Sequence, residues 1–94
     1  MTQVSTFTAT TAGTVIKAGN GVIRNVNITK AGSSDTAITI YDNASAASGP
    51  VLYVGGGAVT GSFALDQETG VNATHGAYIV ISATVAPNVC VYYT

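Results

Sequence analysis

The side chains that could carry acid–base or nucleophilic chemistry are few in this chain. They are one histidine, one cysteine and four carboxylates: His75, Cys90, Asp35, Asp42, Asp66 and Glu68. A single histidine excludes a metal site built on several histidine ligands. A serine nucleophile would have to be paired with His75 and an acid, and no serine lies in a Gly-x-Ser-x-Gly turn. We therefore expect His75 to be structural or exposed, Cys90 to be a small buried hydrophobe, and the protein not to be an enzyme.

Two short motifs could bind an ion or a phosphate. Asp66 and Glu68 are two residues apart and could begin a calcium site together with loop carbonyls. No third carboxylate lies nearby, so a solvated turn is the favoured interpretation. The glycines at residues 55–57 lack the Lys-Ser/Thr pair that completes a phosphate-binding loop, which favours a flexible turn. We expect neither a metal nor a cofactor.

The chain is poor in charge. Charged residues make up 7% of it, against roughly 25% in an ordinary soluble domain, and 47% of its residues are hydrophobic. The basic residues Lys17, Arg24 and Lys30 form no cluster, so nucleic-acid binding is not expected. No signal peptide and no membrane-spanning apolar run are present in these 94 residues. A neutral surface of Thr, Ser, Asn and Gly would keep such a chain soluble, but we favour a surface covered by further copies or by a partner.

The composition predicts an all-β fold. The chain holds 12 Val, 7 Ile and 14 Thr, whereas Leu, Lys, Glu, Gln, Arg and Met together number nine. β-branched residues favour strands, and the scarce group contains the good helix formers.

Turn residues divide the chain into about eight short strands, and the last two organise the rest. We expect strands within residues 3–8, 13–17, 22–30, 36–42, 51–54, 59–65, 77–83 and 89–93. Residues 19–21 and 86–88 are expected to be the turns of an opening and a closing hairpin. This spacing predicts one domain over residues 1–94, a jelly-roll-like β-sandwich, with a small closed barrel as the competing architecture. Residues 1–12 could instead form an extended arm.

Alternation along the strands predicts which side chains share a face. In the last strand Val89, Val91 and Tyr93 point one way, and Cys90 and Tyr92 the other.

In residues 22–30 the same rule places Arg24 on an apolar face with Val22, Val26 and Ile28. An arginine there should lie at a subunit contact or pair with a carboxylate such as Asp42.

Aromatic residues are the other candidates for an interaction surface. The tyrosines could form a face that stacks on sugars, but packing in the core and at interfaces is the favoured use. They are Tyr41, Tyr53, Tyr78, Tyr92 and Tyr93. The expected interface residues are Phe7, Arg24, Tyr53 and Tyr93.

Two stretches resemble small virion proteins of tailed bacteriophages. Residues 26–49 run from a strand through an Ala-Gly-Ser turn to a Thr-rich strand ending in Tyr-Asp-Asn, and then to an Ala/Ser/Gly loop. Residues 76–93 are similar to the closing hairpin of the same group. The resemblance implies a capsid decoration (cement) protein, or another small head or neck component, that is assembled in the host cytoplasm. It also implies a β-sandwich that acts as a trimer, packs onto the major capsid protein and has no catalytic residues.

A glycan-binding adsorption module displayed on the particle is the alternative function. Its mark would be exposed tyrosines around a groove.

Overall fold

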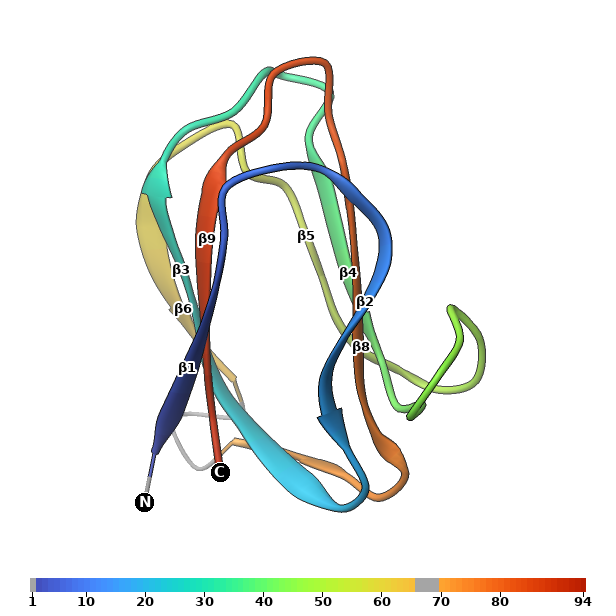
Figure 1. Ribbon diagram of the computed structural model, residues 1–94. Helices are drawn as coiled ribbons and strands as arrows, with labels where there is room; N and C mark the ends of the chain where they lie inside the picture. Colours follow the sequence, from blue (N-terminus) through green and yellow to red (C-terminus); the bar gives the residue numbers. More distant parts are fainter. Residues whose placement is uncertain (1, 66–69) are drawn as a thin grey trace.

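Two facing antiparallel sheets make up the fold (Figure 1). The computed structural model describes residues 2–65 and 70–94. The strands are β1 (Gln3–Phe7), β2 (Thr11–Ala18), β3 (Gly21–Lys30), β4 (Ala37–Tyr41), β5 (Val51–Gly55), β6 (Gly61–Ala64), β7 (Val71–Ala73), β8 (Gly76–Ser82) and β9 (Asn88–Tyr93). Sheet A has the order β1-β9-β3-β6, with β7 also on β3, and sheet B has the order β2-β8-β4-β5. The predicted all-β sandwich is confirmed.

The pairing of strands is nested. β1 pairs with β9, β2 with β8, β3 with β6 and β7, and β4 with β5, so the first half of the chain runs back along the second. The further pairs β3–β9 and β4–β8 divide this long ladder into two sheets. This is the strand order of a jelly roll, as predicted. The strand that the sequence did not indicate is β7, which lies in a polar stretch of the chain.

Both predicted hairpins are wrong. β2 and β3 lie in opposite sheets, and so do β8 and β9, so residues 19–21 and 83–87 cross from one sheet to the other. Gly19 has a φ of 94°, which permits the sharp reversal, but a reversal does not decide whether the flanking strands pair. The consecutive strands that do pair directly are β4 and β5.

The N-terminal stretch is a strand rather than an arm. Residues 3–7 form β1, and all five of them pair with β9 at the edge of sheet A.

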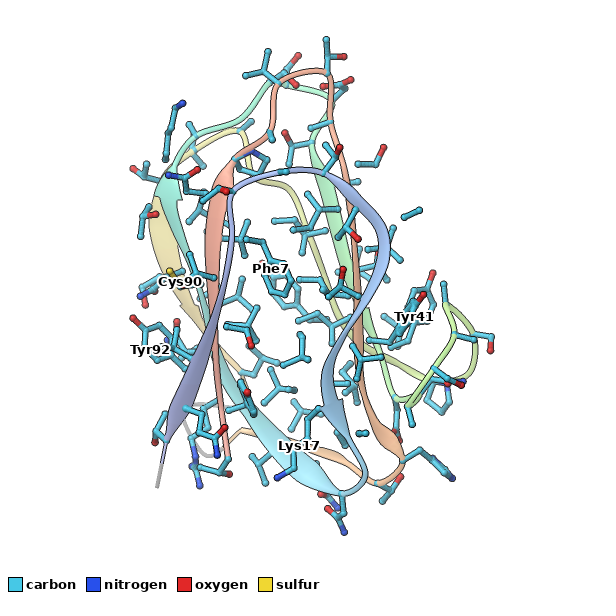
Figure 2. The ribbon with its side chains drawn as sticks, viewed as in Figure 1. Phe7, Lys17, Tyr41, Cys90 and Tyr92 are labelled. Atoms are coloured by element: carbon cyan, nitrogen blue, oxygen red, sulfur yellow. The ribbon has the colours of Figure 1, made fainter. Side chains whose placement is uncertain are left out.

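The core lies between the two sheets. All seven isoleucines are buried. The inner face of sheet B supplies Ile38, Ile40, Ile79 and Ile81, and sheet A faces them with Ile23, Val26, Ile28, Val89 and Val91. The predicted alternation in the last strand is confirmed, since Cys90 and Tyr92 lie on the outer face of sheet A (Figure 2).

A β-bulge overturns the predicted alternation in β3. Ile23 pairs with Tyr93 and Asn25 with Tyr92, so Arg24 is an extra residue in the ladder. One extra residue reverses which face the following side chains occupy. Ile23, before the bulge, and Val26, after it, are therefore both buried in the core. Arg24 does not share a face with Val26.

Candidate functional site

The potentially reactive side chains do not converge. Within residues 2–65 and 70–94, no group of three or more His, Cys, Asp or Glu residues could hold a metal ion. The predicted calcium candidates Asp66 and Glu68 lie outside the described residues. The prediction that Cys90 is buried is wrong, because Cys90 is only half-buried, on the outer face of β9, where its Sγ lies 3.7 Å from the Thr6 hydroxyl. His75 is largely exposed at the corner between β7 and β8.

Asp42 connects the end of β4 to the β7–β8 corner by hydrogen bonds, at one end of the sandwich. Its carboxylate follows β4 and is 7% exposed. It accepts a hydrogen bond of 2.7 Å from the Thr74 hydroxyl and one of 2.8 Å from the backbone N–H of His75. These two bonds hold the pKa of Asp42 at about 2, below its ordinary value of 3.8, and the bond from the His75 N–H has the larger effect. Asp42, suggested as an ion-pair partner for Arg24, is therefore engaged with the β7–β8 corner.

Asp35 connects two loops by hydrogen bonds at the opposite end of the sandwich. It accepts hydrogen bonds from the Ser33 hydroxyl, from the Thr84 hydroxyl at 2.6 Å and from the Thr84 backbone N–H at 3.1 Å. The Ser33 hydroxyl, followed by the Thr84 hydroxyl, lowers the pKa of Asp35 from 3.8 to about 2. Asp35 thus ties the β3–β4 turn to the β8–β9 crossing, and both carboxylates have structural roles.

Acid is expected to destabilise the fold through these two groups. A carboxyl whose folded-state pKa lies below its unfolded value stabilises the fold at higher pH, and protonation removes that contribution. The contribution of Asp35 and Asp42 is therefore complete well above pH 3.8 and is lost as the pH falls toward about 2. Urea unfolding midpoints measured over this range should fall. A double variant, Asp35→Asn with Asp42→Asn, should show a shallower dependence, and a wild-type midpoint unchanged down to about pH 2 would contradict the prediction.

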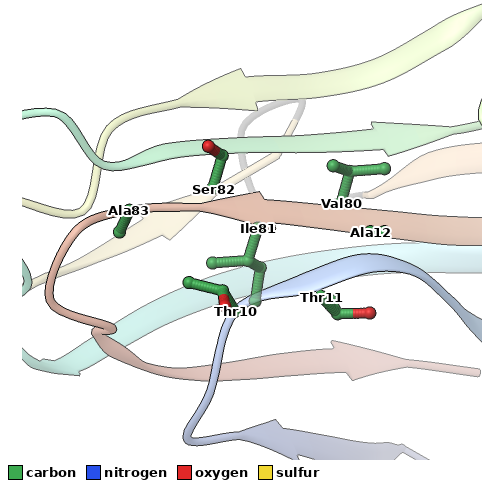
Figure 3. Close-up of a pocket in the computed structure, with 7 residues that line it drawn as sticks. All are labelled: Thr10, Thr11, Ala12, Val80, Ile81, Ser82 and Ala83. Carbon is green, nitrogen blue, oxygen red and sulfur yellow. The ribbon is translucent and has the colours of Figure 1, made fainter.

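A shallow hollow lies where β2 begins beside the end of β8 (Figure 3). It has a volume of about 460 Å³ and is lined by Thr10, Thr11, Ala12, Val80, Ile81, Ser82 and Ala83. None of these residues is charged, and their side chains offer only hydroxyls and apolar groups. The hollow can therefore receive a neutral group but has no means of acid–base or metal chemistry.

The predicted interface residues do not form one surface. Phe7, Tyr53 and Tyr93 are partly buried and pack against the core, and Figure 2 shows Phe7 between the sheets. Burial raises the pKa of the Tyr53 phenol. Arg24 lies at the β3 bulge, half-buried. Their assignment to an interface stays a prediction.

The outer face of sheet B is the surface whose composition stands out. Its side chains follow from the register and lie in three rows across the strands: Val15, Tyr78, Tyr41 and Val51; then Val80, Thr39 and Val54; then Ser82 and Ala37. None of them is charged. Val54 is 72% exposed, Val51 50% and Val15 43%. We call these nine residues the neutral face.

The neighbouring charges lie off the neutral face. Asp42 is drawn to the β7–β8 corner, and the stem of Lys17 lies against Gly21 of the opposite sheet. Figure 2 shows Lys17 at one end of the sandwich and Tyr41 on the outer side of sheet B. The ring of Tyr78 lies over Gly13, where a Cβ would stand 2.0 Å from its hydroxyl oxygen. Gly13 thereby lets the ring pack flat over β2.

Part of the neutral face could have been found from the sequence. In residues 77–83 both alternating sets are apolar, Ile79 and Ile81 on one side and Tyr78 and Val80 on the other. A strand of this kind is buried on both faces or exposes an apolar one. The contributions of Val15, Val51 and Val54 could not be found, because they depend on long-range pairing and on bulges in β2 and β5.

Comparison of the chain with known protein families, curated proteins and solved structures found no match. Among the described residues, no helix is long and apolar enough to cross a membrane.

Proposed function

We propose that this chain is a non-enzymatic virion structural protein of a tailed bacteriophage, a decoration (cement) protein that docks on the major capsid protein through the neutral face. The observation that carries the proposal is the neutral face itself, on which Val54, Val51 and Val15 are exposed and no side chain is charged. Apolar patches of this kind on a folded protein mark contact surfaces.

The chemistry of the neutral face suits packing against another protein. Docking there removes apolar side chains from water without desolvating any charge of its own. Tyr41 and Tyr78 are direct neighbours across β4 and β8, and each adds an aromatic ring with a hydroxyl that can find a partner at the rim. Attachment of this kind depends on shape and apolar burial rather than on charge attraction.

The virion setting is supported by the resemblance of residues 26–49 and 76–93 to small phage virion proteins. Those residues include the second half of β3 and the whole of β4, β8 and β9, which are the four central strands of the two sheets. The expected trimer and the major capsid protein as partner belong to the same proposal. Light scattering on the purified protein measures the number of copies.

Binding to capsids is expected to fail in Val54→Lys and to survive high salt. The lysine places an unpaired charge in the middle row of the neutral face, at a residue that is 72% exposed and contributes little to the core. Co-sedimentation with capsids of the parent phage, at low and at molar NaCl, measures both effects. Val85→Lys is the matched control, because Val85 is 56% exposed but lies on the connection between β8 and β9, where its backbone bonds with Ser33 and not with the neutral face. Equal binding by the two variants, or release of the wild-type protein by salt, would contradict the proposal.

A glycan-binding module is the second candidate, favoured by the Tyr41–Tyr78 pair on the outside of sheet B. Aromatic rings on a flat sheet can stack on sugar rings. Binding on a glycan array that is lost in Tyr41→Ala would favour this function over capsid docking.

A further inference from the structure

The four sheet edges are not equally protected. An exposed edge strand offers unpaired N–H and C=O groups to other strands, and proteins protect such edges with bulges, proline or short strands. β2 has two register shifts, and β5 follows Pro50 and is bulged against β4. The remaining edge of sheet A is divided between β6 and β7, of four and three residues.

β1 has neither a bulge nor a proline, and it is longer than β6 and β7. Its five residues pair with β9 one for one, without a register shift. The strand contains no proline, glycine or charged residue, and Val4 on its outer side is 51% exposed. Among the strands that the structure describes, β1 is the one regular, unbroken edge (Figure 1).

We propose that β1 pairs antiparallel with β1 of a second copy and joins the two A sheets into one. The proposal deepens the self-association that the proposed function includes and rests on it. The groups to be satisfied alternate N–H and C=O along an extended backbone, and only another strand matches that spacing.

A second copy fits this edge because the segment is self-compatible. Residues 2–16 carry no charged side chain, so two copies meet there without repulsion between like charges. With a two-fold axis at Ser5, Val4 lies opposite Thr6 of the second copy on the outer face, and Phe7 lies opposite Gln3 on the inner face. Both pairs are compatible with cross-strand packing.

The protected edges also determine how far the assembly grows. A contact between two identical edges is closed by two copies, whereas growth would need a second open edge on each copy. The expected product is therefore a dimer, and it replaces the trimer that the resemblance to phage virion proteins implies. Both neutral faces stay uncovered in it, so that the dimer can dock at two points and gain avidity.

The test compares lysine substitutions on two edge strands. Val4→Lys places two lysines close together at the two-fold contact, whereas Val54→Lys changes an exposed valine on β5. Light scattering over a dilution series should show a wild-type dimer, a Val4→Lys dissociation constant raised at least about tenfold, and an unchanged Val54→Lys dimer. In capsid co-sedimentation the two variants should behave in the opposite way. Single Val4→Lys subunits should still attach to capsids, whereas Val54→Lys should not.

Amide hydrogen exchange provides a readout that does not depend on a variant. In the wild-type protein, protection within Gln3–Phe7 should rise with protein concentration, while the amides of β5 should not change. A monomer at high concentration, a trimer, or a Val4→Lys dimer as stable as the wild type would overturn the β1 pairing. Those outcomes leave capsid docking intact, and loss of docking in Val85→Lys would not affect the β1 result.

Discussion

Ile79→Ala is expected to lower the free energy of unfolding by about 2–5 kcal/mol, the largest single effect predicted for this chain. Ile79 lies in β8 between β2 and β4, and none of its side chain is exposed. Shortening it removes buried apolar atoms and leaves a cavity between two sheets whose strands cannot close in without breaking their pairing. A domain of this size is stable by only about 5–15 kcal/mol, so the loss is a large fraction of the total.

Urea unfolding at neutral pH measures this loss. Val54→Ala is the control, since Val54 is 72% exposed and its truncation should change the free energy of unfolding by less than about 0.5 kcal/mol. Similar losses in the two variants would mean that the core is not where the structure places it.

Gly76→Ala is expected to lower the free energy of unfolding by about 2–4 kcal/mol, because backbone strain and steric overlap act together. Gly76 has a φ of 146°, a conformation that side chains other than glycine rarely adopt. A Cβ there would stand 2.6 Å from the Lys17 carbonyl oxygen and 3.0 Å from the Ala44 Cα, and both are backbone atoms. The strand β2, the loop after β4 and the start of β8 meet at this point, so none of them can move away freely.

Gly19→Ala separates the two causes. Gly19 also has a positive φ, 94°, but no atom lies within 4 Å of the position of its Cβ. Gly19→Ala should therefore lower the free energy of unfolding through backbone strain alone, by about 1–2 kcal/mol. Thermal or urea unfolding of the two variants gives the difference, and equal losses would show that overlap at Gly76 contributes nothing.

Local chemistry made several features predictable. The shortage of helix formers indicated an all-β chain, and the alternation of Val89 and Val91 against Cys90 and Tyr92 placed the correct side chains inside. Most strands begin and end within a few residues of the predicted limits, because glycine, proline and asparagine interrupt the apolar runs.

Other features depended on partners distant in sequence. The reversal at residues 19–21 was recognised, but β2 pairs with β8 rather than with β3. Arg24 was assigned to the wrong face because a bulge in β3 shifts the alternation, and no pattern in residues 22–30 predicts that bulge. Asp42 bonds with Thr74 and His75, which approach it only because β7 leads into β8 beside the end of β4.

Local patterns in the amino-acid sequence are enough to predict the fold class, most of the strands, the shortage of charge and the alternation of side chains in the last strand. Each of these follows from properties of neighbouring residues, chiefly the two-residue period of a strand. Contacts between strands distant in the sequence determine which strands pair and where bulges reverse the alternation. They therefore also determine which apolar residues gather on the neutral face and which edge stays open. The reason is that every strand here has backbone groups able to pair with any other, and only the combined burial of both sheets selects one arrangement.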